Sequence, residues 1–415
     1  MRIGVIGAGI IGATSALALA RAGHEVVIFD RKGVAAETSR GNAGAFAFAD
    51  IIPLATPGIL RKAPKWLLDP LGPLSLPPAY ALRIAPWLLR FWRASWRDRY
   101  ATAVAAQVAL MQVSQAALAD LLRDYHLQDL IRTDGQLQLY EGEAAFAAAM
   151  PGLRVRQQHG IAVDLLTAPA AIAAIQPGLV PRFTHAAFTP AWSNVTDPAI
   201  WTEAVLIEAQ RLRAKLKIAA VTAITPSDAG VTLATPTGPD RFDRIVLATG
   251  AFSNPLLQDM NLRLPLDTER GYNTTLPAGA FDLRTHVTFA DHGFVVTRIG
   301  DGVRVGGAVE LGGMDLPPNM ARADALLAKA KRFMPDLVTS GGTQWMGFRP
   351  SMPDSLPVIG AHPDDPRIVL AFGHGHLGLT QSAGTARLVA DLIAGAPPQI
   401  DLTPYRPTRF FGYRA

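Results

Sequence analysis

The first thirty residues constrain the fold more strongly than any other stretch of the chain. An apolar run at 2–6 reads as a buried parallel strand, and the sequence GAGIIG at 7–12 reads as a tight turn. Residues 13–22 have the composition of a helix, and the run 25–29 reads as a second strand that ends on Asp30. Strand, glycine turn, helix, strand and terminal acid in this order predict a Rossmann-like unit that binds a dinucleotide.

Each glycine of the turn has a separate physical role. Gly7 permits the sharp change of direction, Gly9 lets a pyrophosphate approach the backbone, and Gly12 lets the helix pack closely on the strand. The helix N-terminus offers free N–H groups and the positive end of its dipole to the phosphates. Asp30 is placed to accept both hydroxyls of an adenosine ribose, and it would repel a 2′-phosphate. This disfavours NADP and leaves NAD and FAD open.

The same segment could be taken for a signal peptide or a membrane span, because residues 3–20 carry no charge. Glycines at 4, 7, 9 and 12 suit a turn better than a hydrophobic segment, and Arg2 alone is a thin basic flank. We therefore expect a folded dinucleotide-binding unit at the N-terminus.

The size and composition of the chain indicate a two-domain globular protein. With 415 residues the chain is too long for one ordinary core. There are no cysteines, which excludes disulfides, thiolate metal sites, iron–sulfur clusters and a cysteinyl flavin link, and makes a reducing, cytoplasmic location the default. The net charge of +5 forms no obvious basic stripe outside one region, so nucleic acid is not an expected partner.

Later segments supply the rest of a dinucleotide-binding domain. The runs 217–224 and 230–234 predict a hairpin, and the apolar run 244–248 predicts a third cofactor-binding strand that leads into Thr249 and Gly250. Near the C-terminus, residues 373–380 form a second glycine turn that opens the last long helix.

The segments between these parts follow other patterns. Alternating runs at 286–289, 293–298 and 303–309 predict antiparallel strands without a βαβ unit. The expected fold class is therefore α/β plus α+β: a Rossmann-like FAD-binding or NAD-binding domain with an inserted antiparallel-sheet substrate domain. We expect 1–55, 195–268 and 345–415 to form the first domain, and 56–194 and 269–344 to form the second.

Residues 61–99 form a basic, tryptophan-rich arm. The arm holds Trp66, Trp87, Trp92 and Trp96, and its eight basic residues outnumber two acidic ones. Six prolines are expected to break it into short pieces that cannot span a bilayer, whereas tryptophan and leucine interleaved with arginine suit the lipid headgroup layer. The alternative is an arm that packs its tryptophans on its own domain.

The chain at this point resembles a known group, the amine- and amino-acid-oxidising FAD flavoproteins. The resemblance rests on the N-terminal turn with Asp30, on Ala248-Thr249-Gly250, on Trp345-x-Gly-x-Arg349-Pro350, and on the turn at 373–380. That group is typified by D-amino-acid oxidase, glycine oxidase, sarcosine oxidase and the bacterial D-amino-acid dehydrogenases. The motifs at 269–272, 306–310 and 373–378 are most similar to the D-amino-acid dehydrogenase branch, including enzymes of the D-proline and hydroxyproline type.

The resemblance implies a set of cofactor-binding residues for non-covalent FAD. Adenosine is expected on Asp30, pyrophosphate on the first turn, and the isoalloxazine between 39–44 and 373–380. A loop such as 38–44 could also be an ordinary connector. The implied contacts are Gly7, Gly9, Ile10, Ile11, Gly12, Asp30, Arg31, Thr38, Ser39, Asn42, Ala43, Gly44, Val221, Thr249, Gly250, Arg349, Gly375, His376, Leu377, Gly378, Leu379 and Thr380.

Four residues are implied at the reaction centre. Arg349 matches the family arginine that grips the substrate carboxylate, and a planar guanidinium suits that task; the alternative is an internal salt bridge. Tyr272 is either a second carboxylate contact or a packed sheet tyrosine. His374 and His376 are general bases by residue type, but hydride transfer needs alignment more than a base, so we expect them to shape the pocket. No metal site is expected.

The predicted activity is oxidative deamination of a small D-amino acid or cyclic secondary amino acid, with electrons passed to a quinone or another carrier. Alternatives are an oxygen-using amino-acid or glycine/sarcosine-type oxidase, a flavin-bearing subunit of a larger dehydrogenase complex, and an NAD-dependent dehydrogenase. The last is weakened because the second glycine turn and the Arg349-Pro350 element have no role in it. We expect a cytoplasmic protein, with the arm at 61–99 as its contact to the inner face of the cell membrane under the headgroup interpretation.

Overall fold

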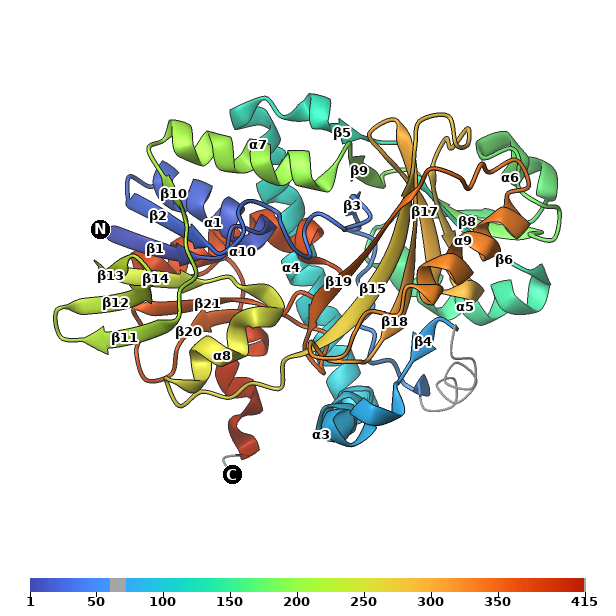
Figure 1. Cartoon of the computed structure of the whole chain (residues 1–415). Helices are drawn as coiled ribbons and strands as arrows, with labels where there is room; N and C mark the ends of the chain where they lie inside the picture. Colours follow the sequence, from blue (N-terminus) through green and yellow to red (C-terminus); the bar gives the residue numbers. More distant parts are fainter. Residues whose placement is uncertain (60–71, 414–415) are drawn as a thin grey trace.

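The computed structural model describes residues 1–59 and 72–413 and contains two large sheets that lie side by side (Figure 1). The first sheet has six strands in the order β10-β2-β1-β14-β21-β20. All neighbours in it are parallel except β20, which runs antiparallel to β21. Its strands are β1 (Arg2–Ile6), β2 (Glu25–Asp30), β10 (Lys215–Ile218), β14 (Arg244–Leu247), β20 (Val358–Ala361) and β21 (Ile368–Phe372).

The N-terminal unit folds as its sequence predicts. Strands β1 and β2 pair in parallel and are joined by helix α1 (Ile10–Arg21), which begins three residues before the expected position. Gly7 adopts a φ of +106°, and a Cβ on Gly12 would collide with the Gly7 carbonyl oxygen. Both positions therefore require glycine.

The expected hairpin from 217–224 is wrong in its first half. Strand β10 leaves the hairpin and pairs in parallel with β2, so that Lys217 lies opposite Phe29. The hairpin instead joins β11 (Ala223–Ser227) to β12 (Gly230–Thr235), which continues to β13 (Gly238–Phe242). The run 217–224 contains no glycine or proline that would mark the end of β10 and the start of β11. The break between these strands arises because β10 pairs with the edge of β2.

Helices cover one face of the six-stranded sheet, and the small sheet β11–β13 covers the other. The helical layer consists of α1, α7 (Pro198–Arg211) and α10 (Gly378–Ala394), and Asp197 caps α7 by accepting hydrogen bonds from the backbone N–H groups of Ala199 and Ile200. The opposite layer packs Val231, Leu233 and Phe242 against the sheet, together with α8 (Ser253–Gln258).

The second large sheet confirms the predicted antiparallel domain and extends it. Its nine strands run in the order β19-β15-β18-β17-β16-β6-β8-β7, with β4 beside β18. Neighbours are antiparallel except for β6 with β16 and β4 with β18. The strands are β4 (Leu74–Ser75), β6 (Gln136–Tyr140), β7 (Asp164–Leu166), β8 (His185–Thr189), β15 (Asp267–Leu276), β16 (His286–Phe289), β17 (Phe294–Ile299), β18 (Gly302–Glu310) and β19 (Thr343–Ser351).

The two faces of this sheet differ in chemistry. Side chains of a strand alternate between faces, and one face carries an apolar core that is covered by α9 (Ala321–Phe333). Phe294 lies in that core, stacked on Phe289 with ring centroids 4.5 Å apart, so it is not a pocket residue. The other face carries polar residues, including Arg349, Glu269, Asn273, Arg304 and His286, and it is this face that has side-chain hydrogen bonds to the loop at 40–42.

The remaining elements pack around the two sheets. Helix α4 (Arg97–Tyr125) packs buried residues such as Ala117, Leu118 and Leu121 into the helical layer. Among the described residues it is the one helix whose length and composition would suit a membrane span, and its packing here is that of a core helix. The other elements are β3 (Ala45–Phe46), β5 (Ile131–Arg132), β9 (Ser193–Val195), α5 (Gly142–Gln158) and α6 (Pro169–Ile175), with 3₁₀ turns at Gln128–Leu130, Gly250–Phe252, Ala290–His292, Thr403–Tyr405 and Pro407–Tyr413.

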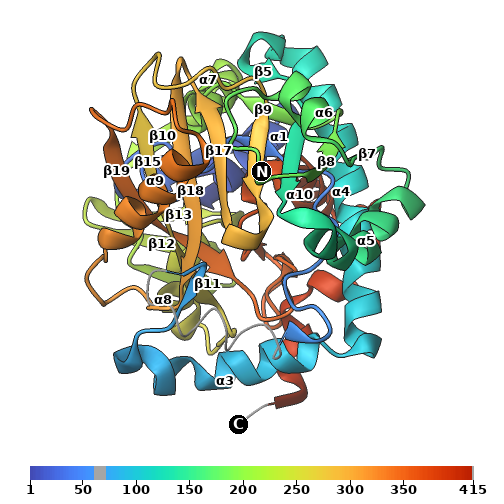
Figure 2. The ribbon, with the colours of Figure 1, turned by 90° about the vertical axis from the view of Figure 1, so that its right-hand side faces the viewer.

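The arm at 61–99 is less broken than its prolines suggest. Residues 60–71, and with them Trp66, lie outside the described residues. From Pro78 the chain forms a single helix, α3 (Pro78–Ala94), which tolerates Pro86 in its interior. Pro77 and Pro78 stand at the helix start, where a missing N–H costs nothing. Figure 2 shows α3 lying across the lower end of the molecule, with α4 rising from it.

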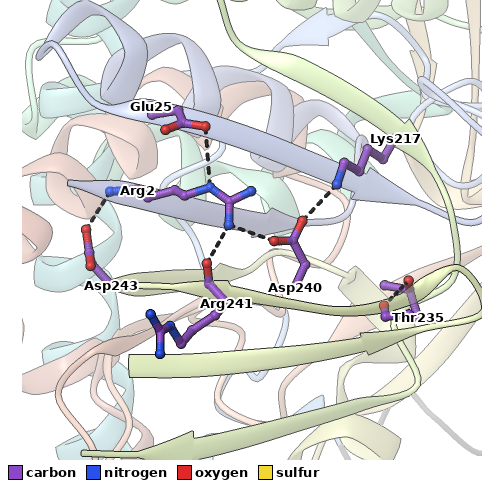
Figure 3. Close-up of polar contacts among 8 residues, drawn as sticks. Arg2, Glu25, Lys217, Thr235, Asp240, Arg241 and Asp243 are labelled. Carbon is purple, nitrogen blue, oxygen red and sulfur yellow. Dashed lines mark hydrogen bonds and ion pairs between the residues drawn. The ribbon is translucent and has the colours of Figure 1, made fainter. Parts of the chain in front are cut away.

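An ionic cluster ties the N-terminus to the small sheet (Figure 3). Arg2 donates to Asp240 at 2.6 Å and to Glu25 at 3.3 Å, and Lys217 donates to Asp240 at 2.8 Å. The hydrogen bond from Arg2, assisted by Lys217, lowers the pKa of Asp240 to about 2. The carboxylate form of Asp240 thus holds β13 against both β1 and β10.

This cluster predicts a pH-dependent stability difference. Asp240→Asn is expected to lower the free energy of unfolding by ~1 kcal/mol at pH 7, because solvent screens the partly exposed partners. A carboxyl whose pKa is depressed on folding stabilises the fold above its unfolded pKa and loses that effect as the pH falls through the folded value. The difference from wild type should therefore shrink between about pH 4 and pH 2. Urea unfolding followed by tryptophan fluorescence measures it, with Asp336→Asn as the exposed control; a difference that stays constant across this range would contradict the assignment.

Candidate functional site

One cavity of about 470 Å³ brings the two glycine turns together. Its wall includes Gly7, Gly9 and the first residues of α1, and also Gly375, Gly378 and Leu379 at the start of α10. The two turns follow β1 and β21, which flank β14 in the parallel sheet. Their C-terminal ends therefore lie at the same edge.

Most of the predicted cofactor contacts line this cavity. Those that do are Gly7, Gly9, Ile10, Ile11, Asp30, Arg31, Thr38, Ser39, Asn42, Val221, Thr249, Gly250, Gly375, Gly378 and Leu379. Those that lie outside its wall are Gly12, Ala43, Gly44, Arg349, His376, Leu377 and Thr380. Of the four predicted reaction-centre residues, only His374 borders it.

The first turn is organised by Asp30 and Ser39. Asp30 accepts hydrogen bonds from the backbone N–H groups of Ala8 at 2.9 Å, Lys32 at 2.8 Å and Gly33 at 3.0 Å. Ser39 accepts a hydrogen bond from the N–H of Ile10 at 3.0 Å. Helix α1 has no acidic residue in its first turn, so its positive end is open to an anion in the cavity.

The second turn lies at the start of another helix. Helix α10 begins at Gly378, has no acidic residue in its first turn, and receives no side-chain cap from Leu377. Gly373 and Gly375 have φ values of +84° and +56°, and the N–H of Gly375 donates to the carbonyl of Pro350 at 2.7 Å. Thr380, which lies outside the cavity wall, accepts from the N–H of Ala47 and donates to the carbonyl of Ala45, and so fastens α10 to β3.

His374 is held as a neutral side chain. Its Nε2 lies 3.0 Å from the hydroxyl of Thr385 in the interior of the protein. Burial lowers the pKa of His374 to about 3, so the imidazole carries no charge at neutral pH. This geometry agrees with the expectation that His374 shapes the pocket, which remains a prediction.

The loop at 38–44 is fixed by the polar face of the large sheet. Thr38 donates to the carbonyl of Phe348 at 2.7 Å, and Asn273 donates to the carbonyl of Gly41 at 3.1 Å. Arg304 donates to the carbonyls of Arg40 at 3.1 Å and Asn42 at 2.6 Å. Sequence reasoning gave no role to Arg304 or Asn273, because their shared face follows from the pairing of β15 with β18.

Arg349 lies across the polar face of the large sheet. Its Nη1 donates to the carbonyl of Ala308 at 3.0 Å, and its guanidinium covers Gly271, where a Cβ would collide with it. A β-bulge in β18 presents that carbonyl: Ala308 has a φ of +54°, and the register shifts opposite Gly271. Burial lowers the pKa of Arg349, which still leaves a guanidinium charged at neutral pH. Within the described residues Arg349 forms no ion pair, so the internal salt bridge that we considered is not found.

His376 borders a second, much smaller cavity of about 20 Å³. Glu269, Ser351 and Gln107 share its wall. Burial lowers the pKa of His376, against an opposing effect of the carboxylates Asp50 and Glu269. In the sequence, Glu269 was part of the motif at 269–272 but was given no role. Its position beside His376 was not predicted.

Tyr272 does not reach either cavity. Its hydroxyl accepts a hydrogen bond from the N–H of Asn319 at 3.1 Å, and its ring packs in the apolar core beneath α9. Adjacent residues on a strand point to opposite faces, and Gly271 is on the face with Arg349. Of the two alternatives for Tyr272, the structure therefore shows the packed sheet tyrosine and not the carboxylate contact.

Comparison with known proteins identifies the family. A family profile described as FAD dependent oxidoreductase, DAO, matches residues 2–392. The chain belongs to this family. It is 34% identical over 426 residues to a D-amino-acid oxidase of Bradyrhizobium diazoefficiens, with 98% of each chain covered. It is 32% identical over 418 residues to a D-amino acid dehydrogenase of Rhizobium johnstonii, covering 99% of this chain and 100% of that one.

Solved structures share the fold of this DAO-family chain. Glycine oxidase from Geobacillus kaustophilus superposes with a TM-score of 0.77 at 22% identity, covering 98% of this chain and 99% of that chain. L-proline dehydrogenase from P. horikoshii superposes with a TM-score of 0.76 at 19% identity, covering 99% and 98%. These comparisons confirm the family resemblance, the mixed α/β fold and the dependence on FAD, and they set aside the NAD-dependent interpretation.

The cavity fits FAD on its own chemistry. At Gly7 a Cβ would lie 2.5 Å from the Ala248 carbonyl oxygen, so the turn leaves backbone in place of side chain beside the cavity. Two helix ends without an acidic residue in the first turn, together with the Asp30 carboxylate, are chemically suited to a diphosphate and a ribose. The DAO-family chain is thus an FAD-dependent oxidoreductase that acts on amino acids. Among the described residues no cluster of metal-ligating side chains is present.

Proposed function

We propose that this flavoenzyme oxidises a small D-amino acid or cyclic secondary amino acid, of the D-proline or hydroxyproline type, to an imine. The observation that carries the proposal is Arg349, a partly buried guanidinium bound to one carbonyl, with further N–H donors and no carboxylate partner within the described residues. Planar paired donors are matched to a carboxylate. Bound FAD supplies the hydride acceptor.

The protein's own groups prepare the pocket for that reaction. Arg349 orients the substrate through its carboxylate, which fixes the α-carbon relative to the flavin loop at 38–44. His374, whose pKa burial lowers to about 3, acts as a neutral wall, and His376 stands beside Glu269 at the small cavity. The open N-terminus of α10 stabilises negative charge in the cavity. These roles need no proton transfer by a histidine.

Anaerobic mixing with a substrate panel tests the activity. We expect D-amino acids, with D-proline and hydroxyproline among the fastest, to bleach the visible absorbance of the flavin, and the corresponding L-amino acids to bleach it more slowly. Because the relatives include both dehydrogenases and an oxidase, the electron acceptor is measured separately. We expect a soluble quinone to reoxidise the reduced flavin faster than oxygen does. Bleaching by 2-hydroxy acids alone would contradict the proposal. Turnover of the purified chain with an artificial dye as electron acceptor would exclude the alternative that the chain is an inactive subunit of a larger complex.

The Arg349 assignment predicts the effect of a methyl group on its neighbour. Gly271→Ala is expected to push the guanidinium off the sheet and to raise the amino-acid concentration for half-maximal flavin reduction about ten- to a hundredfold, as expected for losing charged hydrogen bonds of about 1.5–3 kcal/mol. FAD content should not change. Gly360→Ala on β20 is the matched control. An unchanged concentration dependence in Gly271→Ala would show that Arg349 does not anchor the substrate.

A second proposal concerns the exposed side of α3. Leu82 is 91% exposed and Leu89 64%, while Trp92 and Trp96 are 41% and 45% exposed, and Trp87 is buried. Arg83, Arg97 and Arg99 are exposed beside them. An apolar strip flanked by arginines fits the headgroup layer of an anionic membrane, which also dissolves quinone acceptors. We therefore propose peripheral membrane contact through 78–99.

Vesicle binding tests this surface. The wild-type holoenzyme is expected to sediment with phosphatidylglycerol vesicles, less so with neutral vesicles, and less at high salt. The double variant Leu82→Ser, Leu89→Ser should weaken binding about tenfold or more, whereas Ile207→Ser on α7 should not. Absence of wild-type binding to anionic vesicles at low salt would refute the membrane role.

A further inference from the structure

Two opposite charges share one face of the large sheet without forming an ion pair. Glu269 of β15 lies directly opposite Arg349 of β19, and such residues emerge on the same face with Cβ atoms about 5 Å apart. Arg349 nevertheless extends over Gly271 to Ala308. In the part of the chain that the structure describes, Glu269 has no hydrogen bond and no ion pair, although its side chain belongs to a residue only 6% exposed.

The same sheet shows what a structural glutamate looks like. Glu310 of β18 is equally buried, at 3% exposure, but it accepts from Arg270 at 3.1 Å and lies 3.9 Å from Arg322. A buried carboxylate without such contacts is costly, because the hydrogen bonds that it made to water are not replaced. Glu269 therefore lacks the contacts that would explain it as part of the framework.

The space beside Glu269 is small and polar. The 20 Å³ cavity is bordered by Glu269, His376, Gln107 and Ser351, and the Ser351 hydroxyl is buried without a partner. A space of this size holds about one water molecule. An ammonium group is of similar size, carries a positive charge and offers N–H donors to a carboxylate and a hydroxyl.

We propose that Glu269 binds the α-ammonium group of the amino acid whose carboxylate is held by Arg349. This inference rests on the proposed function and specifies how that site recognises an amine. An α-amino acid carries its two charges on one carbon, so it needs an anionic and a cationic partner side by side. Glu269 and Arg349, adjacent on paired strands and not bonded to each other, provide that arrangement.

The arrangement also explains rejection of other acids. A carboxylic or 2-hydroxy acid bound to Arg349 would bring a second negative charge close to Glu269 without a cation between them. Like charges held together in a buried site are unfavourable, so Glu269 discriminates against ligands that lack an amine. If Glu269 were only part of the framework, loss of its charge would not weaken the binding of amino acids while strengthening the binding of acids that lack an amine.

The test compares two ligands in the holoenzyme. Glu269→Gln keeps the size of the side chain and removes its charge. We expect it to raise the concentration of D-proline for half-maximal flavin reduction about tenfold or more. It should also tighten binding of cyclopentanecarboxylate, which keeps the ring and carboxylate but lacks the amine, as measured by the shift of the flavin spectrum. Glu203→Gln, an exposed change on α7, is the matched control.

The outcomes separate this inference from the proposed function. If the wild type is bleached by no amino acid, the proposed function fails and the inference with it. Suppose instead that the wild type is bleached, but Glu269→Gln weakens the binding of both ligands, strengthens the binding of both, or changes neither. In that case the inference alone fails. A loss confined to lysine and arginine would also overturn it, because Glu269 would then bind a substrate side chain. Glu269→Asp, which keeps the charge, should retain the preference for the amine, and FAD content verifies folding of each variant.

Discussion

The parallel pairing of β1, β14 and β21 is the constraint on which the rest of the structure depends. Parallel neighbours end at the same edge of a sheet, so Ile6 and Phe372, far apart in the sequence, deliver their glycine turns to one cavity. Each turn then starts a helix whose first N–H groups have no partner within the helix. The site is thus made mainly of backbone, and glycine is required because a Cβ at Gly7 would collide with the carbonyl of Ala248.

The large sheet adds side-chain chemistry to this backbone site, and strand alternation decides which residues take part. Tyr272 and Phe294 belong to the face under α9 and build the core, whereas Arg349, Asn273 and Arg304 belong to the face that meets the loop at 38–44. One rigid surface therefore holds both the loop at 38–44 and the proposed substrate anchor. A shift of one residue in any of these strands would exchange core and site.

Much of this was readable from the sequence, and the exceptions have physical causes. The N-terminal motif, the strand at 244–248 and the final turn were recognised because glycine spacing reports local backbone geometry, which neighbours in sequence determine. The role of Tyr272 was left open because its face depends on the pairing of β15 with β18 and β19, which no local pattern reveals. Lys217 was assigned to a hairpin because its pairing with the edge strand β2 depends on the tertiary fold and leaves no local sequence signal. Glu269 and Arg304 were overlooked because their role depends on what lies opposite them.

The β-bulge at Ala308 explains why Arg349 stays apart from the carboxylate beside it. The bulge costs strain, since Ala308 is held at a positive φ that disfavours an L residue, and such strain persists where the surroundings impose it. In return the Ala308 carbonyl accepts from Arg349 across Gly271, which draws the cation away from Glu269. The bulge and the glycine together keep two opposite charges separate, and a zwitterionic ligand is the simplest molecule that would join them.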